Sequence, residues 1–283
     1  MISRLRPSTP SVPHLAPAEW VMLGAFGVFC FVFPFATVLM SFDLMPWGME
    51  WMSSLLLAML GLACGAWMVV NFGRVGLWLS LGVLAAGVAL EYIGVITGVP
   101  FGQYRYTGVL VPELPGGVPI AIGFAWLLVV VGGLFSARWL LARANVRPRG
   151  PWPANLLGAG LSVGLDLLLE PVAYHIKGYW QWHTEPSQGY YGVPWSNFAA
   201  WLVSALVMNG LVSWATGGGK GLRWRWLPVW LYGMNVFMFG VVNVMHGFWV
   251  PGAIMVVLLG VLGFGFIRRG VKMGQSPTNL SHT

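Results

Sequence analysis

Two carboxylate side chains, Asp166 and Glu170, lie one helical turn apart in the apolar segment GLDLLLEP, residues 164–171. Residues four apart in a helix share one face, so both acids would face the same space. An acid in a membrane segment costs ~2.5–3.5 kcal/mol on insertion scales, so it usually faces a polar interior and has a function. Two such carboxyls are not easily both ionised, and at least one is expected to keep its proton near neutral pH. The pair could therefore donate a proton, or could only bond a neighbouring helix.

The composition around these acids is that of a membrane protein. Of the 283 residues, 57% are hydrophobic and only 8% are charged, whereas about a quarter are charged in a soluble domain. The apolar runs are long and continuous rather than alternating, which favours helices over a β-barrel. We expect an all-α, polytopic integral membrane bundle. Its single transmembrane domain would comprise residues 18–272, between flexible cytoplasmic tails at residues 1–17 and 273–283.

Eight apolar runs come near the ~20 residues that a helix needs to cross a bilayer. If both termini are cytoplasmic, all Lys and Arg residues except Arg105 and Lys177 fall on inner segments. This is the positive-inside pattern, and it predicts a multi-pass membrane protein with both termini in the cytoplasm. The predicted spans are residues 20–41, 51–71, 75–97, 117–138, 153–174, 195–215, 227–246 and 249–267.

With this orientation, several polar residues gather at one depth, in the outer ends of their spans. We expect them to line one cavity beneath the outer loops, with the acids at its centre and the other residues completing a polar network. The acids are Glu91, Asp166 and Glu170, and the network residues are Asn197, Asn243 and His246.

An internal repeat supports this grouping. The segment GVPIAIGFAW (117–126) is similar to GVPWSNFAAW (192–201), at an offset of 75 residues. The same offset relates Glu91 to Asp166. Both copies would run in the same direction, so we expect a parallel repeat of spans three and four in spans five and six. Glu91 and Asp166 would then face each other across a pseudo-twofold axis, unless the similarity is a coincidence among common residue types.

The outer loops are rich in aromatic residues. Tyr104 and Tyr106 lie in PFGQYRYTG (100–108), and Trp180 and Trp182 lie in YHIKGYWQW. An interfacial aromatic belt would explain some of them. Their functional interpretation is a substrate pocket whose ring faces stabilise a cation. The chain lacks nucleotide-binding motifs and the repeated His spacing of membrane di-iron enzymes, so no cofactor or metal is expected.

These residues also carry a family resemblance, which covers roughly residues 75–250. The chain resembles the carotenoid 1,2-hydratases of bacteria and archaea, the CruF-type group that includes the bisanhydrobacterioruberin hydratases. In that family the acid before the proline of the fifth span is usually Asp, and here it is Glu170. The similar segments are EYIGVITGVPFGQYRYTG, GGVPIAIGFAW, the Glu170–Pro171 pair, GYWQW and YYGVPWSNFAAW.

The resemblance implies addition of water across the terminal C1=C2 double bond of an acyclic (ψ) carotenoid end group, giving a 1-hydroxy-1,2-dihydro carotenoid. The residues agree with this chemistry. A carboxylic acid that protonates C2 would leave a tertiary cation at C1, and water oriented by a second carboxylate would attack it. Asp166 is the expected general acid, and Glu91 or Glu170 would position or activate water.

The expected partners are a lipophilic carotenoid, lycopene-like or with one ψ end, water as co-substrate, and membrane lipid; no nucleic acid is expected. Two other functions stay open. A proton-coupled transporter would also place acids in helices and show a repeat, but it needs a polar path to both faces. A non-catalytic carotenoid-binding membrane protein would need the cavity without the acids.

Overall fold

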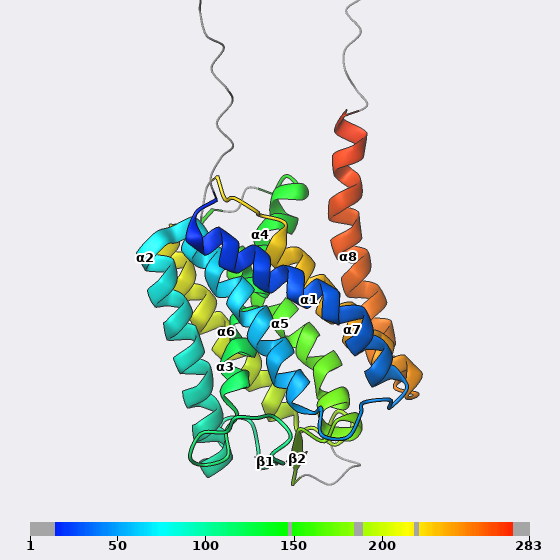
Figure 1. Ribbon diagram of the computed structural model, residues 1–283. Helices are drawn as coiled ribbons and strands as arrows, with labels where there is room; N and C mark the ends of the chain where they lie inside the picture. The colour runs from blue at the N-terminus through cyan, green and yellow to red at the C-terminus, as the bar shows by residue number, and fades with distance from the viewer. Residues whose placement is uncertain (1–14, 147–148, 184–188, 218–220, 274–283) are drawn as a thin grey trace, which may run out of the picture.

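The chain forms a bundle of long helices in the computed structural model (Figure 1). The structure describes residues 15–146, 149–183, 189–217 and 221–273, with the backbone alone for 267–273. The predicted tails therefore lie almost entirely outside the described residues. The long helices are α1 (Pro17–Ser41), α2 (Trp51–Thr97), α6 (Trp195–Thr216), α7 (Leu227–Met245) and α8 (Trp249–Met273).

Two further segments are long enough to cross a membrane, and each contains a π-helical turn, which is wider than a turn of α-helix. The first runs from α3 (Ile120–Leu127) through the π-helical turn η1 (Leu128–Gly132) into α4 (Gly133–Arg143). The second runs from α5 (Trp152–Pro171) into the π-helical turn η2 (Val172–Ile176). Pro171 has no backbone N–H, which disfavours regular α-helical hydrogen bonding at this point. Single π turns occur frequently at functional sites, and η2 begins two residues after Glu170.

In the described part of the chain, seven helical segments are long and apolar enough to cross a membrane. The all-α membrane fold is thus confirmed, although eight spans were predicted. The difference lies in α2, whose 47 residues contain the second and third predicted spans. At Gly73 the backbone adopts φ 58° and ψ −132°, a conformation that favours glycine. The helix reverses there, so its two limbs run in opposite directions (Figure 1).

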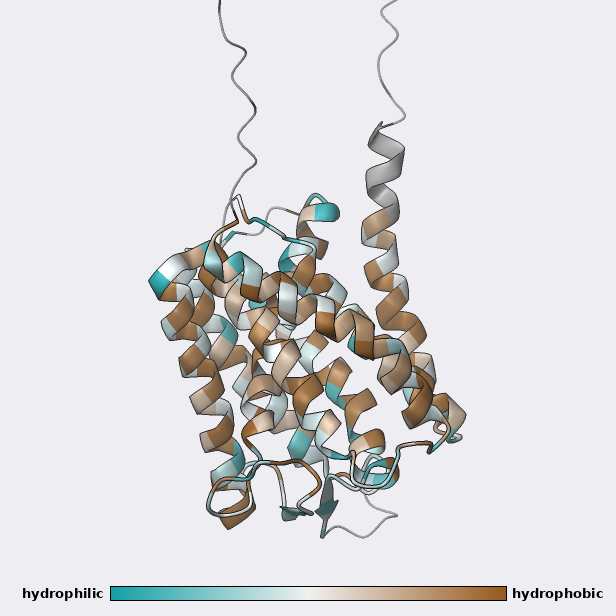
Figure 2. Cartoon of the chain, in the orientation of Figure 1, coloured by the Kyte–Doolittle hydropathy of each residue, from teal (hydrophilic) through white to brown (hydrophobic). Residues whose placement is uncertain are grey.

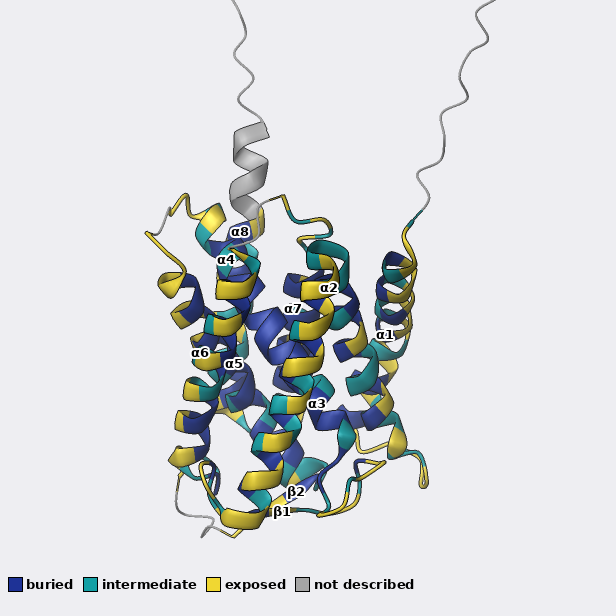
Figure 3. Cartoon of the chain, turned by 90° about the vertical axis from the view of Figure 1, so that its left-hand side faces the viewer, coloured by how far each residue is buried: buried dark blue, intermediate teal, exposed yellow. Residues whose placement is uncertain are grey.

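The bundle turns an apolar surface outward, as a membrane protein requires (Figure 2). In Figure 3 the exposed residues of α2 and α6 lie on the outer side of each helix, and the buried residues face the interior. Inside, small residues let helices approach closely, as is common in membrane bundles. At Gly87 of α2, a Cβ atom would collide with the indole of Trp126 on α3. This glycine therefore makes room for a tryptophan in the bundle interior.

One end of the bundle is covered by a small sheet, the only paired strands among the described residues. Strand β1 (Tyr104–Tyr106) pairs antiparallel with β2 (Trp180–Trp182), and Arg105 lies opposite Gln181. Side chains alternate between the two faces of a strand, so Arg105 and Gln181 point away and bond to each other, with Nη2 and Oε1 2.8 Å apart. Their neighbours on each strand point into the bundle. Helix α1 begins and helix α8 ends toward the opposite end of the bundle (Figure 1).

Candidate active site

A cavity of about 40 Å³ lies beneath the sheet. This volume can hold two or three water molecules, since one water needs roughly 10–15 Å³ on this measure. Two acids and a shell of aromatic rings make up most of its wall. Its lining residues are Glu91, Phe101, Tyr104, Tyr106, Ile122, Ala125, Trp126, Leu169, Glu170, Trp180, Trp182, Asn197 and Trp201.

Glu91, in the second limb of α2, receives three hydrogen bonds. The hydroxyls of Tyr104 and Tyr106 donate to its Oε2 over 2.6 and 2.8 Å. The indole N–H of Trp126 donates to its Oε1 over 3.3 Å. Burial, reinforced by the nearby Glu91 charge, raises the pKa of both tyrosines well above the usual phenol value, so each keeps its proton and remains a donor. Hydrogen bonds to a carboxylate favour its charged form.

Glu170, near the end of α5, is held in the same way by the other strand. The indole N–H groups of Trp180 and Trp182 both donate to its Oε2 over 3.0 Å. Asn197 of α6 donates to its Oε1 over 3.1 Å. Each strand of the sheet thus supplies two donors, two residues apart, to one carboxylate. In this pattern the counterpart of Glu91 is Glu170, and not Asp166 as the 75-residue offset suggests.

Asp166 has a different environment from the other two acids. It is completely buried, and its Oδ2 accepts one hydrogen bond, over 3.0 Å, from the Nδ2 of Asn197. Its Oδ1 is buried and has no protein partner. The single amide of Asn197 therefore bridges Asp166 and Glu170, and Asp166 is the acid with the fewest donors.

The structure brings together eight of the ten residues that the sequence singled out. The three acids, Asn197 and the four aromatic residues of the strands are joined by the contacts above. Asn243 lies apart, because its amide donates to the backbone oxygens of Leu168 and Phe239. His246 lies at the end of α7, with its Nε2 3.0 Å from the Oδ2 of Asp43 in the loop after α1. Neither side chain lines the cavity. Asp166 does not line it either, and is connected to it through the amide of Asn197.

Residues 51–262 match the family described as "Carotenoid biosynthesis protein". The chain belongs to this family. It is also 31% identical over 182 residues to the bisanhydrobacterioruberin hydratase of Haloarcula japonica. That alignment covers 63% of this chain, and the chain spans 58% of the length of the relative. No solved structure matches the chain. The predicted family resemblance is thus confirmed, and the family match includes all three acids and both strands.

A second cavity in this family member lies beside the first. Its volume is about 60 Å³, and it shares Ile122, Ala125, Leu169 and Trp180 with the carboxylate cavity. Its other walls come from α1, the first limb of α2 and α7, and they are almost entirely apolar. At its edge the hydroxyl of Tyr179 donates to Ser53 over 2.7 Å. An apolar space therefore adjoins the acidic one, and Trp180 lines both.

Two tryptophans of the site were quoted in the sequence repeat but were given no role. Trp126 and Trp201, the last residues of the two similar segments, stack with ring centroids 4.6 Å apart and planes 19° apart. Both line the carboxylate cavity. The predicted repeat pairs these two residues through its offset of 75, and a pseudo-twofold axis would pass between equivalent residues that stack in this way.

No metal-binding arrangement accompanies these side chains. Within the residues that the structure describes, no group of three or more His, Cys, Asp or Glu side chains could hold a metal ion. No Lys or Arg is among the residues that line the carboxylate cavity. The chemistry that the site itself offers is therefore that of carboxyl groups, hydrogen-bond donors and aromatic faces.

Proposed function

We propose that this protein is a hydratase that adds water across the terminal C1=C2 double bond of an acyclic (ψ) carotenoid end group. The family and the printed name of the relative support a hydratase acting on a carotenoid. One observation carries the proposed mechanism. Of three neighbouring buried acids, two accept three donors each, whereas Asp166 accepts one and has an unpaired oxygen.

Asp166 is the proposed proton donor. Hydrogen bonds from N–H and O–H groups favour the ionised forms of Glu91 and Glu170. A third negative charge beside them would be costly in a poorly hydrated space, so Asp166 carries the proton. Asp166 does not line the carboxylate cavity, so its unpaired Oδ1 would present this proton once an entering end group has moved the neighbouring side chains apart. A carboxylic acid so positioned can act as a general acid, which typically contributes 10²–10⁴-fold in rate.

The proposed reaction balances within the site. The π electrons of C1=C2 take the proton of Asp166 at C2, leaving a tertiary cation at C1. The carboxylates of Glu91 and Glu170 and the surrounding ring faces stabilise this positive charge. Water then attacks C1 and gives up a proton to Glu170, which shares the amide of Asn197 with Asp166. Return of that proton to Asp166 completes the cycle without a redox step.

In this proposal, the two cavities hold different parts of the substrate. The end group would enter the carboxylate cavity, and the apolar polyene would extend into the neighbouring cavity between α1, α2 and α7. An end group is larger than the 40 Å³ cavity, so its entry would displace water and move side chains apart. Trp180 lines both cavities and is the side chain whose movement would join them.

Expression of the protein in a host that makes lycopene tests this proposal. The expected product is a 1-hydroxy-1,2-dihydro carotenoid whose new oxygen comes from labelled water in nucleotide-free, chelator-treated membranes. Oxygen taken from labelled O₂ would contradict hydration. Carotenoid that copurifies unchanged would instead indicate a binding protein, and proton flux without a new product would indicate a transporter.

A further inference from the structure

A second feature lies at the end of the bundle opposite the sheet. A cleft of about 600 Å³ is formed there by α4, the first limb of α2 and the segment before α7. Its lining includes the three arginines Arg138, Arg143 and Arg225. No acidic side chain is among the described residues that line it. Three positive charges in one recess attract an anion much more strongly than single surface charges do.

Arg138 is held in a fixed orientation in this cleft. Its Nη2 donates to the Oγ of Ser213 over 2.8 Å, and its guanidinium lies 4.8 Å from the ring centroid of Phe135. Its Nη1 is buried and has no protein partner. Buried donors are nearly always paired, so an acceptor from outside the protein is expected at this nitrogen.

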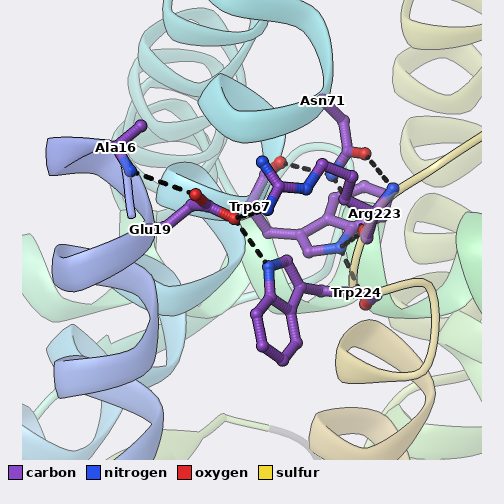
Figure 4. A network of polar contacts seen from close by, with 6 residues as sticks. All are labelled: Ala16, Glu19, Trp67, Asn71, Arg223 and Trp224. Atoms are coloured by element: carbon purple, nitrogen blue, oxygen red, sulfur yellow. Dashed lines mark hydrogen bonds and ion pairs between the residues drawn. The ribbon is translucent and has the colours of Figure 1, made fainter. Parts of the chain in front are cut away.

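The segment that carries Arg225 is also firmly anchored (Figure 4). The indole of Trp67 donates to the backbone oxygens of Arg223 and Trp224 over 3.1 and 3.0 Å. The Nη2 of Arg223 lies 2.7 Å from the Oε1 of Glu19, so an acid of α1 already neutralises this arginine. Arg225, two residues on, lines the cleft instead. Arg223 therefore anchors the segment to α1, and Arg225 contributes its positive charge to the cleft.

An apolar groove adjoins the cleft. Its volume is about 490 Å³, it lies between α4, α5 and α8, and Arg143 lines both spaces. The rest of the groove is aliphatic or aromatic, with Leu157, Val257 and Phe264 in its wall. A basic recess that continues into an apolar groove along membrane helices matches a molecule with an anionic head and a hydrocarbon chain.

We propose that this end of the protein binds one anionic phospholipid, with its phosphate among the three arginines and an acyl chain in the groove beside α8. Guanidinium groups pair with phosphate oxygens in two-pronged hydrogen bonds. Soluble phosphate offers the same head-group chemistry but has nothing to place in the groove. The site is remote from the carboxylates and does not depend on the proposed hydratase activity.

The test uses the purified full-length protein after delipidation. Binding of phosphatidylglycerol, phosphatidylcholine and inorganic phosphate is measured by native mass spectrometry and by the shift in melting temperature. Arg225→Gln and Arg138→Gln each remove one cleft charge. Arg74→Gln is the matched control, because Arg74 is exposed beside Gly73 and does not line the cleft. Gly260→Leu fills the groove at a position where a Cβ atom meets nothing within 4 Å.

We expect tight binding of one phosphatidylglycerol, weakened about fivefold by the loss of each cleft arginine and unchanged in Arg74→Gln. Gly260→Leu should weaken phosphatidylglycerol without affecting inorganic phosphate. Equal binding of phosphatidylcholine, or equal losses in Arg225→Gln and Arg74→Gln, would overturn the proposal. So would binding of inorganic phosphate alone, which would assign the arginines to a soluble anion. Arg225 is exposed and outside the helices, so this variant should fold even if Arg138→Gln does not.

Discussion

Asp166→Asn is the most direct test of the proton donor. The change keeps the size of the side chain and leaves an oxygen that can still accept the hydrogen bond from Asn197, which spans 3.0 Å in the native protein. It removes the acidic proton. An amide in place of an acid does not raise the cost of membrane insertion, so the variant should still be inserted.

The structure allows the two effects of this change to be compared. The site is completely buried, and the new NH₂ group would stand where Oδ1 has no protein partner. An unpaired buried polar group costs about 1–3 kcal/mol. Loss of a general acid typically lowers turnover by 10²–10⁴, or about 2.7–5.4 kcal/mol in the activation free energy. The activation free energy should therefore change by more than the free energy of unfolding.

Activity must be normalised to the amount of folded protein. Turnover of a ψ-ended carotenoid is measured per correctly folded protein, with fold and carotenoid binding followed by size-exclusion chromatography and absorbance. Glu113→Gln is the matched control, because Glu113 is an exposed acid in the loop after β1. Near-normal specific activity of Asp166→Asn would refute our assignment of the proton and direct attention to Glu91 or Glu170. Parallel losses of abundance and activity, with normal turnover per folded molecule, would indicate a purely structural acid.

Three further changes probe the surroundings of that proton. Glu170→Gln should lower turnover on the order of 10²-fold, the usual effect of losing a general base; a full rate in single-turnover assays would contradict this role. Trp182→Phe keeps a ring but removes one donor to Glu170, so turnover should fall about tenfold or more, since a hydrogen bond to a charged group contributes about 1.5–3 kcal/mol; wild-type kinetics would argue against it. Gly87→Ala should displace Trp126 and destabilise the protein by about 1–3 kcal/mol, whereas Gly82→Ala, at an open position, should not change the melting temperature.

The sequence predicted the helices well because long apolar runs are their direct signal. It also predicted two spans, 51–71 and 75–97, that meet at residues 72–74, and the chain reverses there, at Gly73. The strands, in contrast, were missed. Three residues are too few for an alternating pattern to stand out, although YRY and WQW each place one polar residue between two aromatic ones.

The site shows a second limit of sequence reasoning. Charge distribution fixes the depth of a residue along the membrane normal, but not the direction in which its side chain points around the helix. Glu170 and Asn197 point inward and meet. Asn243, predicted at a similar depth, is turned toward the backbone of α5. The two acids that the strands hold also differ in their spacing along the chain: Glu91 and Tyr104 are 13 positions apart, and Glu170 and Trp180 are 10 positions apart.

The position of the carboxylates at one end of the bundle has a consequence for the product. A hydroxyl group made beneath the sheet would form close to one face of the bilayer, within reach of the lipid headgroups of that leaflet. The carotenoid would then leave with its polar end already anchored and its polyene extending toward the opposite leaflet. The second end of a symmetric carotenoid would lie at the far face, out of reach of the same site. Hydration at both ends would require the molecule to turn over in the membrane between two visits, so one-ended products should accumulate first.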